Sequence, residues 1–168
     1  AITNSAITDN SGYGVYSLNG GLSIMDSQVA RTISTTASTK PDMLPKEAPG
    51  TGIRVDVSGS PAISLTLINH STIYSNTDGI YNFGGTVSIP HTTSPNNTGH
   101  AVYHVNTGTT SINNSNIYSN TEGVQNANSS GYQLDARSNW WGRVTGPVLP
   151  GDISLNVDAS GWLPAIVN

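Results

Sequence analysis

The sequence is poor in cysteine, in charge and in long apolar runs, and each shortage excludes a class of protein. None of the 168 residues is a cysteine, which excludes a disulfide framework and thiolate metal sites. Only six residues are basic and the net charge is −4, so a surface that binds nucleic-acid phosphates is not expected. No apolar run approaches the ~20 residues that a membrane-spanning helix needs. Few lysines beside abundant Thr, Ser and Asn favour a secreted or cell-surface protein.

A repeated segment organises what is present. Ile-Tyr-Ser-Asn-Thr-Asp-Gly-Ile at 73–80 returns as Ile-Tyr-Ser-Asn-Thr-Glu-Gly-Val at 117–124, an offset of 117 − 73 = 44, twice 22. A looser copy opens the chain at 7–15. Self-similarity at a fixed period is typical of a solenoid. Stacked rungs share one narrow core, which explains how a chain with 35% hydrophobic residues can fold.

Equal steps of 22 along the chain connect positions of like character. The steps join an apolar column, a column of small residues and a turn column: Ile80, Val102 and Val124; Gly79, Ala101 and Gly123; Asn76, Thr98 and Asn120. Short apolar segments alternate with Asn and Gly, which tolerate left-handed backbone at turns. We therefore predict an all-β fold, a single-stranded parallel β-helix with three short strands per rung and five to six rungs of about 22 residues.

The repeat is interrupted between residues 32 and 50. Pro41, Pro45 and Pro49 fall there, and proline removes the N–H that a central strand needs. We predict a loop inserted into one turn of the coil, with rungs over 1–147 and a capping tail over 148–168. Loops inserted into repeat proteins often bind partners, so Met43 and Leu44 are candidate contact residues. The alternative is a tolerated surface excursion.

The repeat Asn-x-x-Ile-x-x-Asn-x-x-Gly-Ile resembles that of right-handed parallel β-helix proteins, the pectate-lyase-like superfamily. The C-terminal segment Asn139-Trp140-Trp141-Gly142, followed by Gly161-Trp162-Leu163, looks like the closing segment of secreted prokaryotic β-helix repeat domains. The resemblance implies a right-handed coil whose last full rung ends at the Asn-Trp-Trp-Gly segment. We expect Trp140 and Trp141 to pack in the C-terminal cap, and contact with sugar is the alternative. It does not specify a function, because enzymes, adhesins and fibre subunits share this architecture.

One polar column combines an imidazole with two carboxylates. Asp78, His100 and Glu122 follow one another at the same step as the apolar column. Rungs about 4.8 Å apart would place His100 between two carboxylates about 10 Å apart. We predict an ion-pair ladder that raises the pKa of His100, and a cation site as the weaker alternative. No cofactor is expected. No catalytic residue is nominated, because no pair of acids at a defined separation can be recognised.

Tyrosines form two further columns. Tyr16, Tyr81 and Tyr103 each follow an inward Val or Ile and should point outward, while Tyr74 and Tyr118 follow another inward Ile and form a second, gapped column. An amphipathic ring offers apolar area and a hydrogen-bonding tip, which suits a polysaccharide. The alternative is cross-strand stacking that stiffens the sheet.

These features predict a non-catalytic, extracellular or cell-surface β-helix module of a surface, adhesive or fibre-forming protein, with polysaccharide as a candidate partner. One alternative is the C-terminal part of a polysaccharide lyase, hydrolase or epimerase whose active residues lie elsewhere. Another is a self-stacking filament subunit. Residues 1–4 are already repeat sequence, so upstream rungs or another copy should meet the N-terminal end.

Overall fold

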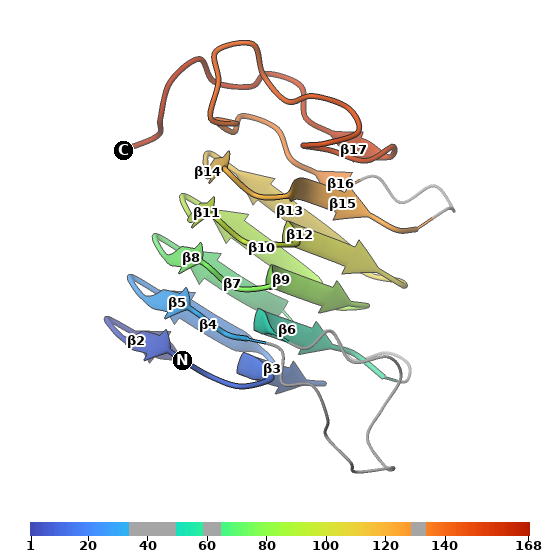
Figure 1. Ribbon diagram of the computed structural model, residues 1–168. Helices are drawn as coiled ribbons and strands as arrows, with labels where there is room; N and C mark the ends of the chain where they lie inside the picture. The colour runs from blue at the N-terminus through green and yellow to red at the C-terminus, as the bar shows by residue number, and fades with distance from the viewer. Residues whose placement is uncertain (34–49, 59–64, 129–133) are drawn as a thin grey trace.

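The computed structural model describes residues 1–33, 50–58, 65–128 and 134–168, and its regular structure there is entirely β (Figure 1). The chain winds as a coil, and its strands stack into three parallel sheets. Sheet 1 contains, in spatial order, β1 (Ile2–Thr3), β4 (Leu22–Met25), β7 (Leu65–Asn69), β10 (Thr86–Pro90), β13 (Thr109–Asn113), β16 (Leu134–Asp135) and β17 (Val157–Asp158). Sheet 2 contains β2 (Ala6–Thr8), β5 (Gln28–Ala30), β8 (Thr72–Tyr74), β11 (Thr93–Pro95) and β14 (Asn116–Tyr118). Sheet 3 contains β3 (Tyr13–Leu18), β6 (Thr51–Asp56), β9 (Asp78–Phe83), β12 (His100–Val105) and β15 (Glu122–Asn126). The predicted parallel β-helix is confirmed.

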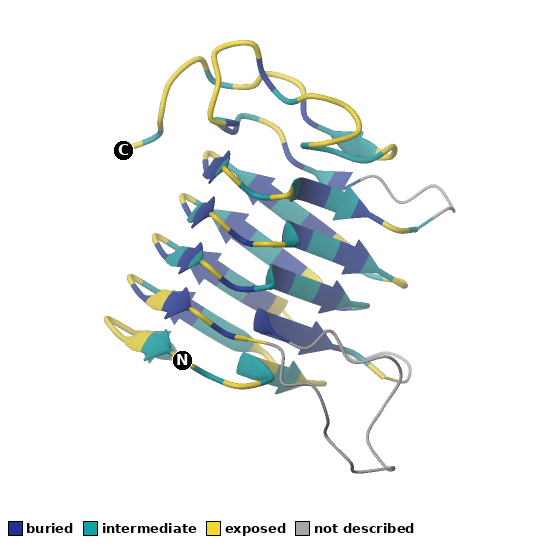
Figure 2. Ribbon diagram, viewed as in Figure 1, coloured by how far each residue is buried: buried dark blue, intermediate teal, exposed yellow. Residues whose placement is uncertain are grey.

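Each sheet turns aliphatic side chains into one shared core. In sheet 3, Val102 pairs in register with Ile80 on one side and Val124 on the other, as the constant step predicts. All three are at most 1% exposed. Sheets 1 and 2 add parallel columns, among them Ile24, Ile68, Ile89, Ile112, Val29, Ile73 and Ile117. Figure 2 shows buried positions in the rungs from β4 onward, whereas the strands of the first rung, β1 to β3, are half-buried or exposed. Each such side chain contributes about 1.5–3 kcal/mol when fully buried.

Single residues with left-handed backbone make the corners between sheets. Positive φ angles of 47–61° recur at the end of the strands of sheets 1 and 2, at Asn4, Asp26, His70, His91, Asn114, Asp9, Arg31, Ser75, Asn96 and Ser119. Asn and Asp adopt this conformation more readily than other non-glycine residues. The coil therefore changes direction at fixed points, and the strands of successive rungs stay aligned.

A ladder of asparagines, two of them buried and one half-buried, follows the corner between sheets 2 and 3. The backbone N–H of Asn76 donates to Oδ1 of Asn97 over 3.0 Å, and the N–H of Asn97 donates to Oδ1 of Asn120 over 2.9 Å. The predicted turn column is therefore wrong at its middle position. Asn97 is 1% exposed, whereas Thr98 lies at the surface.

Unequal rungs explain this error. In sheet 2, Thr93 pairs with Thr72 and with Asn116, so the two steps are 93 − 72 = 21 and 116 − 93 = 23. In sheet 3, Val102 pairs with Ile80 and with Val124, and both steps equal 22. The segment that connects sheet 2 to sheet 3 is therefore one residue longer in the middle rung than in the two rungs beside it. A constant step of 22 predicts the pairs of sheet 3 correctly, but it does not find the asparagine between sheets 2 and 3.

The inserted segment lies within one turn of the coil. Val29 pairs with Ile73, a step of 73 − 29 = 44, so one rung here includes the interruption. The equal step between Ile73 and Ile117 covers two rungs, because β11 lies between β8 and β14. Residues 34–49, including Met43 and Leu44, lie outside the described part of the chain.

The C-terminal tail crosses the end of the stack and continues sheet 1 (Figure 1). Val157 of β17 pairs with Leu134 of β16. Trp141 is 2% exposed within the core cluster, and the Trp140 ring lies 5.2 Å from the Tyr118 ring. Across the described residues, no helix has the length and apolar character to cross a membrane.

Candidate functional site

The outward side of sheet 3 combines aromatic and ionisable side chains in two adjacent columns, which we call the tyrosine face. Tyr16, Tyr81 and Tyr103 each follow an inward aliphatic residue, and successive side chains of a strand point to opposite sides. Asp78, His100 and Glu122 are the half-buried first residues of β9, β12 and β15. At β6 the members of both columns, Thr51 and Arg54, are buried. One column is Tyr16, Arg54, Tyr81, Tyr103 and Gln125, paired in register. The other is Tyr13, Thr51, Asp78, His100 and Glu122.

Aromatic rings occupy neighbouring rungs of this face. Tyr81 and Tyr103 pair in register with ring centroids 5.2 Å apart and planes inclined by 42°. Tyr13 and Tyr16 stack within β3 at 5.5 Å. Tyr16 is 41% exposed, while Tyr81 and Tyr103 are half-buried. Burial raises the pKa of Tyr16 and Tyr81 above the ordinary value for a phenol. A phenol is protonated at neutral pH in any case, so these hydroxyls can donate hydrogen bonds.

Arg54 contacts one ring of each column. Its carbon Cζ lies 4.8 Å from the ring centroid of Tyr81 and 5.3 Å from that of Tyr13. Its Nε donates to both carboxylate oxygens of Asp56, at 2.9 and 3.0 Å, and Asp56 also accepts from the Tyr16 hydroxyl at 3.0 Å. Burial opposes the charge on Arg54, but the bonded carboxylate outweighs it and the pKa of the guanidinium is raised. The side chains of Arg54 and Asp56 are only 4% and 9% exposed, so this pair fixes the rings around it.

The spacing of the sequence did not reveal Arg54 or Asp56. Arg54 follows the inward Ile53, as Tyr81 follows Ile80 and Tyr103 follows Val102, so a signal was present. The inserted segment hid it, because the step from Tyr16 to Arg54 is 54 − 16 = 38 rather than 22.

Asp78, His100 and Glu122 form the second part of the face, which we call the His100 clamp. His100 Nδ1 lies 2.7 Å from Oδ1 of Asp78, and Nε2 lies 3.1 Å from Oε2 of Glu122. The imidazole thus occupies the predicted place between two carboxylates. Burial opposes its protonation, but the hydrogen bond to Asp78 and the two negative charges outweigh burial, and the pKa of His100 is raised above 6.5.

The clamp uses the atoms that a metal would need. Both ring nitrogens of His100 already face a carboxylate oxygen. Within the described ranges, no three His, Asp or Glu side chains are grouped so as to hold a metal ion. The arrangement suits a protonated imidazole that joins three rungs by ion pairs.

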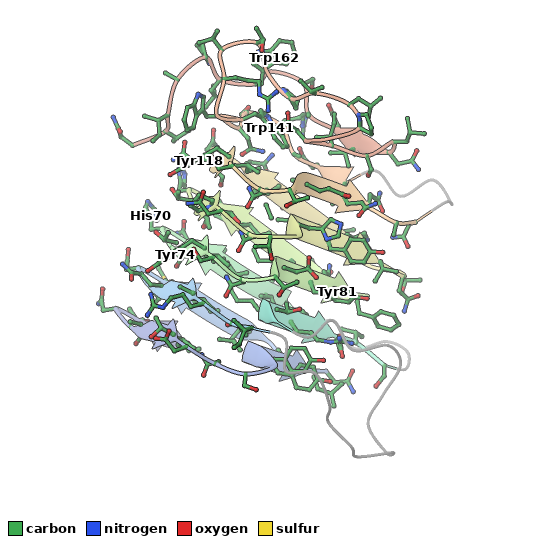
Figure 3. The ribbon with its side chains drawn as sticks, viewed as in Figure 1. His70, Tyr74, Tyr81, Tyr118, Trp141 and Trp162 are labelled. Carbon is green, nitrogen blue, oxygen red and sulfur yellow. The ribbon has the colours of Figure 1, made fainter. Side chains whose placement is uncertain are left out.

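The remaining tyrosines belong to another side of the coil. Tyr74 and Tyr118 lie on sheet 2, and Pro95, which pairs with Tyr118, occupies the rung between them. In Figure 3 both are on the opposite side of the stack from Tyr81. The five predicted tyrosines therefore form two separate surfaces, and the tyrosine face is the one on which tyrosine rings of adjacent rungs, Tyr81 and Tyr103, lie side by side.

A histidine pair at the corner of sheets 1 and 2 was also missed. The rings of His70 and His91 stack with centroids 5.1 Å apart and planes inclined by 16°. They border a hollow of about 170 Å³ that Val167 and Asn168 of the tail also line. The step between them is 91 − 70 = 21, which differs from the constant step used to find columns.

Comparison with protein-family models, with curated proteins and with solved structures finds no match for this chain. Its function is therefore inferred from the residues of the tyrosine face. Their chemistry combines exposed aromatic area, phenolic donors and charges that are already paired within the face.

Proposed function

We propose that this chain is a non-catalytic, extracellular or cell-surface β-helix module that binds a glycan along the tyrosine face. The observation that carries the proposal is the pair of outward rings of Tyr81 and Tyr103 on adjacent rungs, with Arg54 fixed between Tyr13 and Tyr81. Rings held in place lose little freedom on binding, and they offer flat apolar area to the C–H face of a sugar.

The carboxylates of the tyrosine face are paired with cations, which favours ligand binding over catalysis. Asp56 accepts hydrogen bonds from Arg54, and both Asp78 and Glu122 contact His100. A general acid or base needs a pKa matched to proton transfer and a position beside the reacting bond. Carboxylates already neutralised by a bonded cation serve poorly in that role, so the face is better suited to hold a ligand than to cleave it.

Retention on insoluble glycans tests the proposal. Tyr81→Ala and Tyr103→Ala should each weaken retention on the matrix that holds the parent protein, by several-fold to about tenfold, since an aromatic contact is worth about 0.5–1.5 kcal/mol beyond area burial. Tyr74→Ala is the matched control on sheet 2 and should bind like the parent. Thermal unfolding of all three variants shows whether any loss comes from the fold.

Two outcomes would overturn the proposal. Equal retention of parent, Tyr81→Ala and Tyr103→Ala, with reduced stability of the two variants, would assign the rings to stiffening of the sheet. Release of soluble products from neutral or uronic-acid polysaccharides, assayed with and without calcium, would replace a binding module by a polysaccharide-cleaving enzyme.

A further inference from the structure

A cavity of about 850 Å³ opens where the tyrosine face meets the C-terminal tail. Glu122 and Gln125, the last members of the two outward columns, line one side of it. The tail lines the other side, mainly with Leu149, Leu155 and Asn156. The cavity is therefore continuous with the face on which we place the glycan.

The lining of the cavity is that of a site for a neutral ligand. Leu149 and Leu155 are 53% and 73% exposed, and they bring apolar surface to a chain whose surface is otherwise rich in Ser, Thr and Asn. Gln125 and Asn156 add amide groups, and Glu122 is the one charged residue among the described residues of the lining. Apolar walls with a few polar groups and a volume of about 300–1,000 Å³ are typical of small-molecule sites.

The tail also closes the face at this end. The N–H of Val124 donates to the carbonyl of Asp152 over 2.8 Å, and Ile153 forms a bridge with Val124. The segment that carries Leu149 and Leu155 thus lies directly on β15, the last strand of sheet 3. A glycan chain that follows the outward rings of Tyr81 and Tyr103 meets the tail residues of the cavity wall, Leu149 and Leu155, at this end.

We propose that the cavity binds the terminal sugars of a neutral glycan whose following units lie along the tyrosine face. This proposal rests on the proposed function and adds two properties to it. The module recognises chain ends rather than the interior of a polymer. It also discriminates against uronic-acid chains, because the His100 clamp beside the cavity holds two carboxylates and one imidazolium, an excess of one negative charge, and Arg54 is already paired.

Calorimetric titration with short and long glycans tests this site. The probes are gluco-, xylo- and mannohexaose and the corresponding soluble β-glucan, xylan and mannan, compared at equal mass of sugar, with polygalacturonate as the acidic probe. The hexaose of the bound class should titrate more tightly by mass than its polymer, in proportion to its larger number of chain ends. Polygalacturonate should bind more weakly than either.

The substitution Leu155→Ser tests whether the hexaose binds in the cavity. The substitution should weaken hexaose binding by about tenfold, since it removes apolar area that the ligand would cover. Val144→Ser, at an equally exposed position (71%) that does not line the cavity, is the matched control and should leave binding unchanged. Both wild-type side chains are largely exposed, so neither substitution should unfold the chain.

The results of these titrations distinguish binding in the cavity from binding on the tyrosine face alone. Full hexaose affinity in Leu155→Ser, or equal binding of hexaose and polymer by mass of sugar, overturns the cavity site and leaves the tyrosine face as the binding surface. Tighter binding of polygalacturonate than of the neutral chains overturns the neutral specificity. No heat from any probe with the wild-type protein overturns both the cavity site and the proposed function.

Discussion

Replacing Asn97 by alanine should destabilise the coil more than most single substitutions. The side chain is 1% exposed and connects three rungs. Its Oδ1 accepts from the backbone N–H of Asn76 at 3.0 Å, and its Nδ2 donates to Oδ1 of Asn120 at 3.0 Å and to the carbonyl of Ile73 at 3.2 Å. Alanine cannot replace any of these bonds.

The cost follows from the groups that are left without a partner. The buried N–H of Asn76 loses its acceptor, and an unsatisfied buried donor costs about 1–3 kcal/mol. The carbonyl of Ile73 keeps a bond from the Ser94 hydroxyl, so the lost Nδ2 bonds add only about 1 kcal/mol. The expected loss is thus about 2–4 kcal/mol. For a chain of this size that loss corresponds to a fall in Tm of about 4–16 °C.

Urea and thermal unfolding followed by circular dichroism measure the loss, and the neighbouring residue provides the control. Thr98 lies at the surface, and Thr98→Ala should change stability by less than about 0.5 kcal/mol. The opposite ranking, with Thr98→Ala costly and Asn97→Ala neutral, would refute the asparagine ladder. It would restore the register that a constant step predicts.

Two further predictions concern sheet 3. Because the pKa of His100 is raised in the folded state, the clamp adds stability that is complete below pH 6.5 and is lost as pH rises through the folded pKa. The Tm difference between wild type and His100→Gln should therefore shrink between about pH 5 and about pH 9, and a constant difference would contradict the ion pairs. In Gly79→Ala, the new Cβ would lie 2.6 Å from the carbonyl oxygen of Ala101, which should cost about 1–3 kcal/mol in urea unfolding. Gly20→Ala, where the nearest atom is 3.7 Å away, is the control, and an equal loss there would exclude crowding as the cause.

The sequence by itself determined the fold and the alignment of β9, β12 and β15 in sheet 3. Ile80, Val102 and Val124 must stack if the coil has a constant step, and the structure pairs them in register. The same step predicted that His100 lies between two carboxylates. Backbone pairing fixes the spacing of adjacent strands, so residues at equal positions in successive rungs become neighbours whatever their side chains are.

Only the tertiary structure decided the features that depend on unequal rungs. It placed Asn97 rather than Thr98 in the ladder, because one rung is a residue shorter in sheet 2 and the next is a residue longer. It brought Arg54 between Tyr16 and Tyr81 across the inserted segment. It also folded the tail onto β15 to form the cavity. A sequence period predicts only those contacts that recur in every rung. The corners, the inserted segment and the tail do not recur, so their contacts are known only from the folded coil.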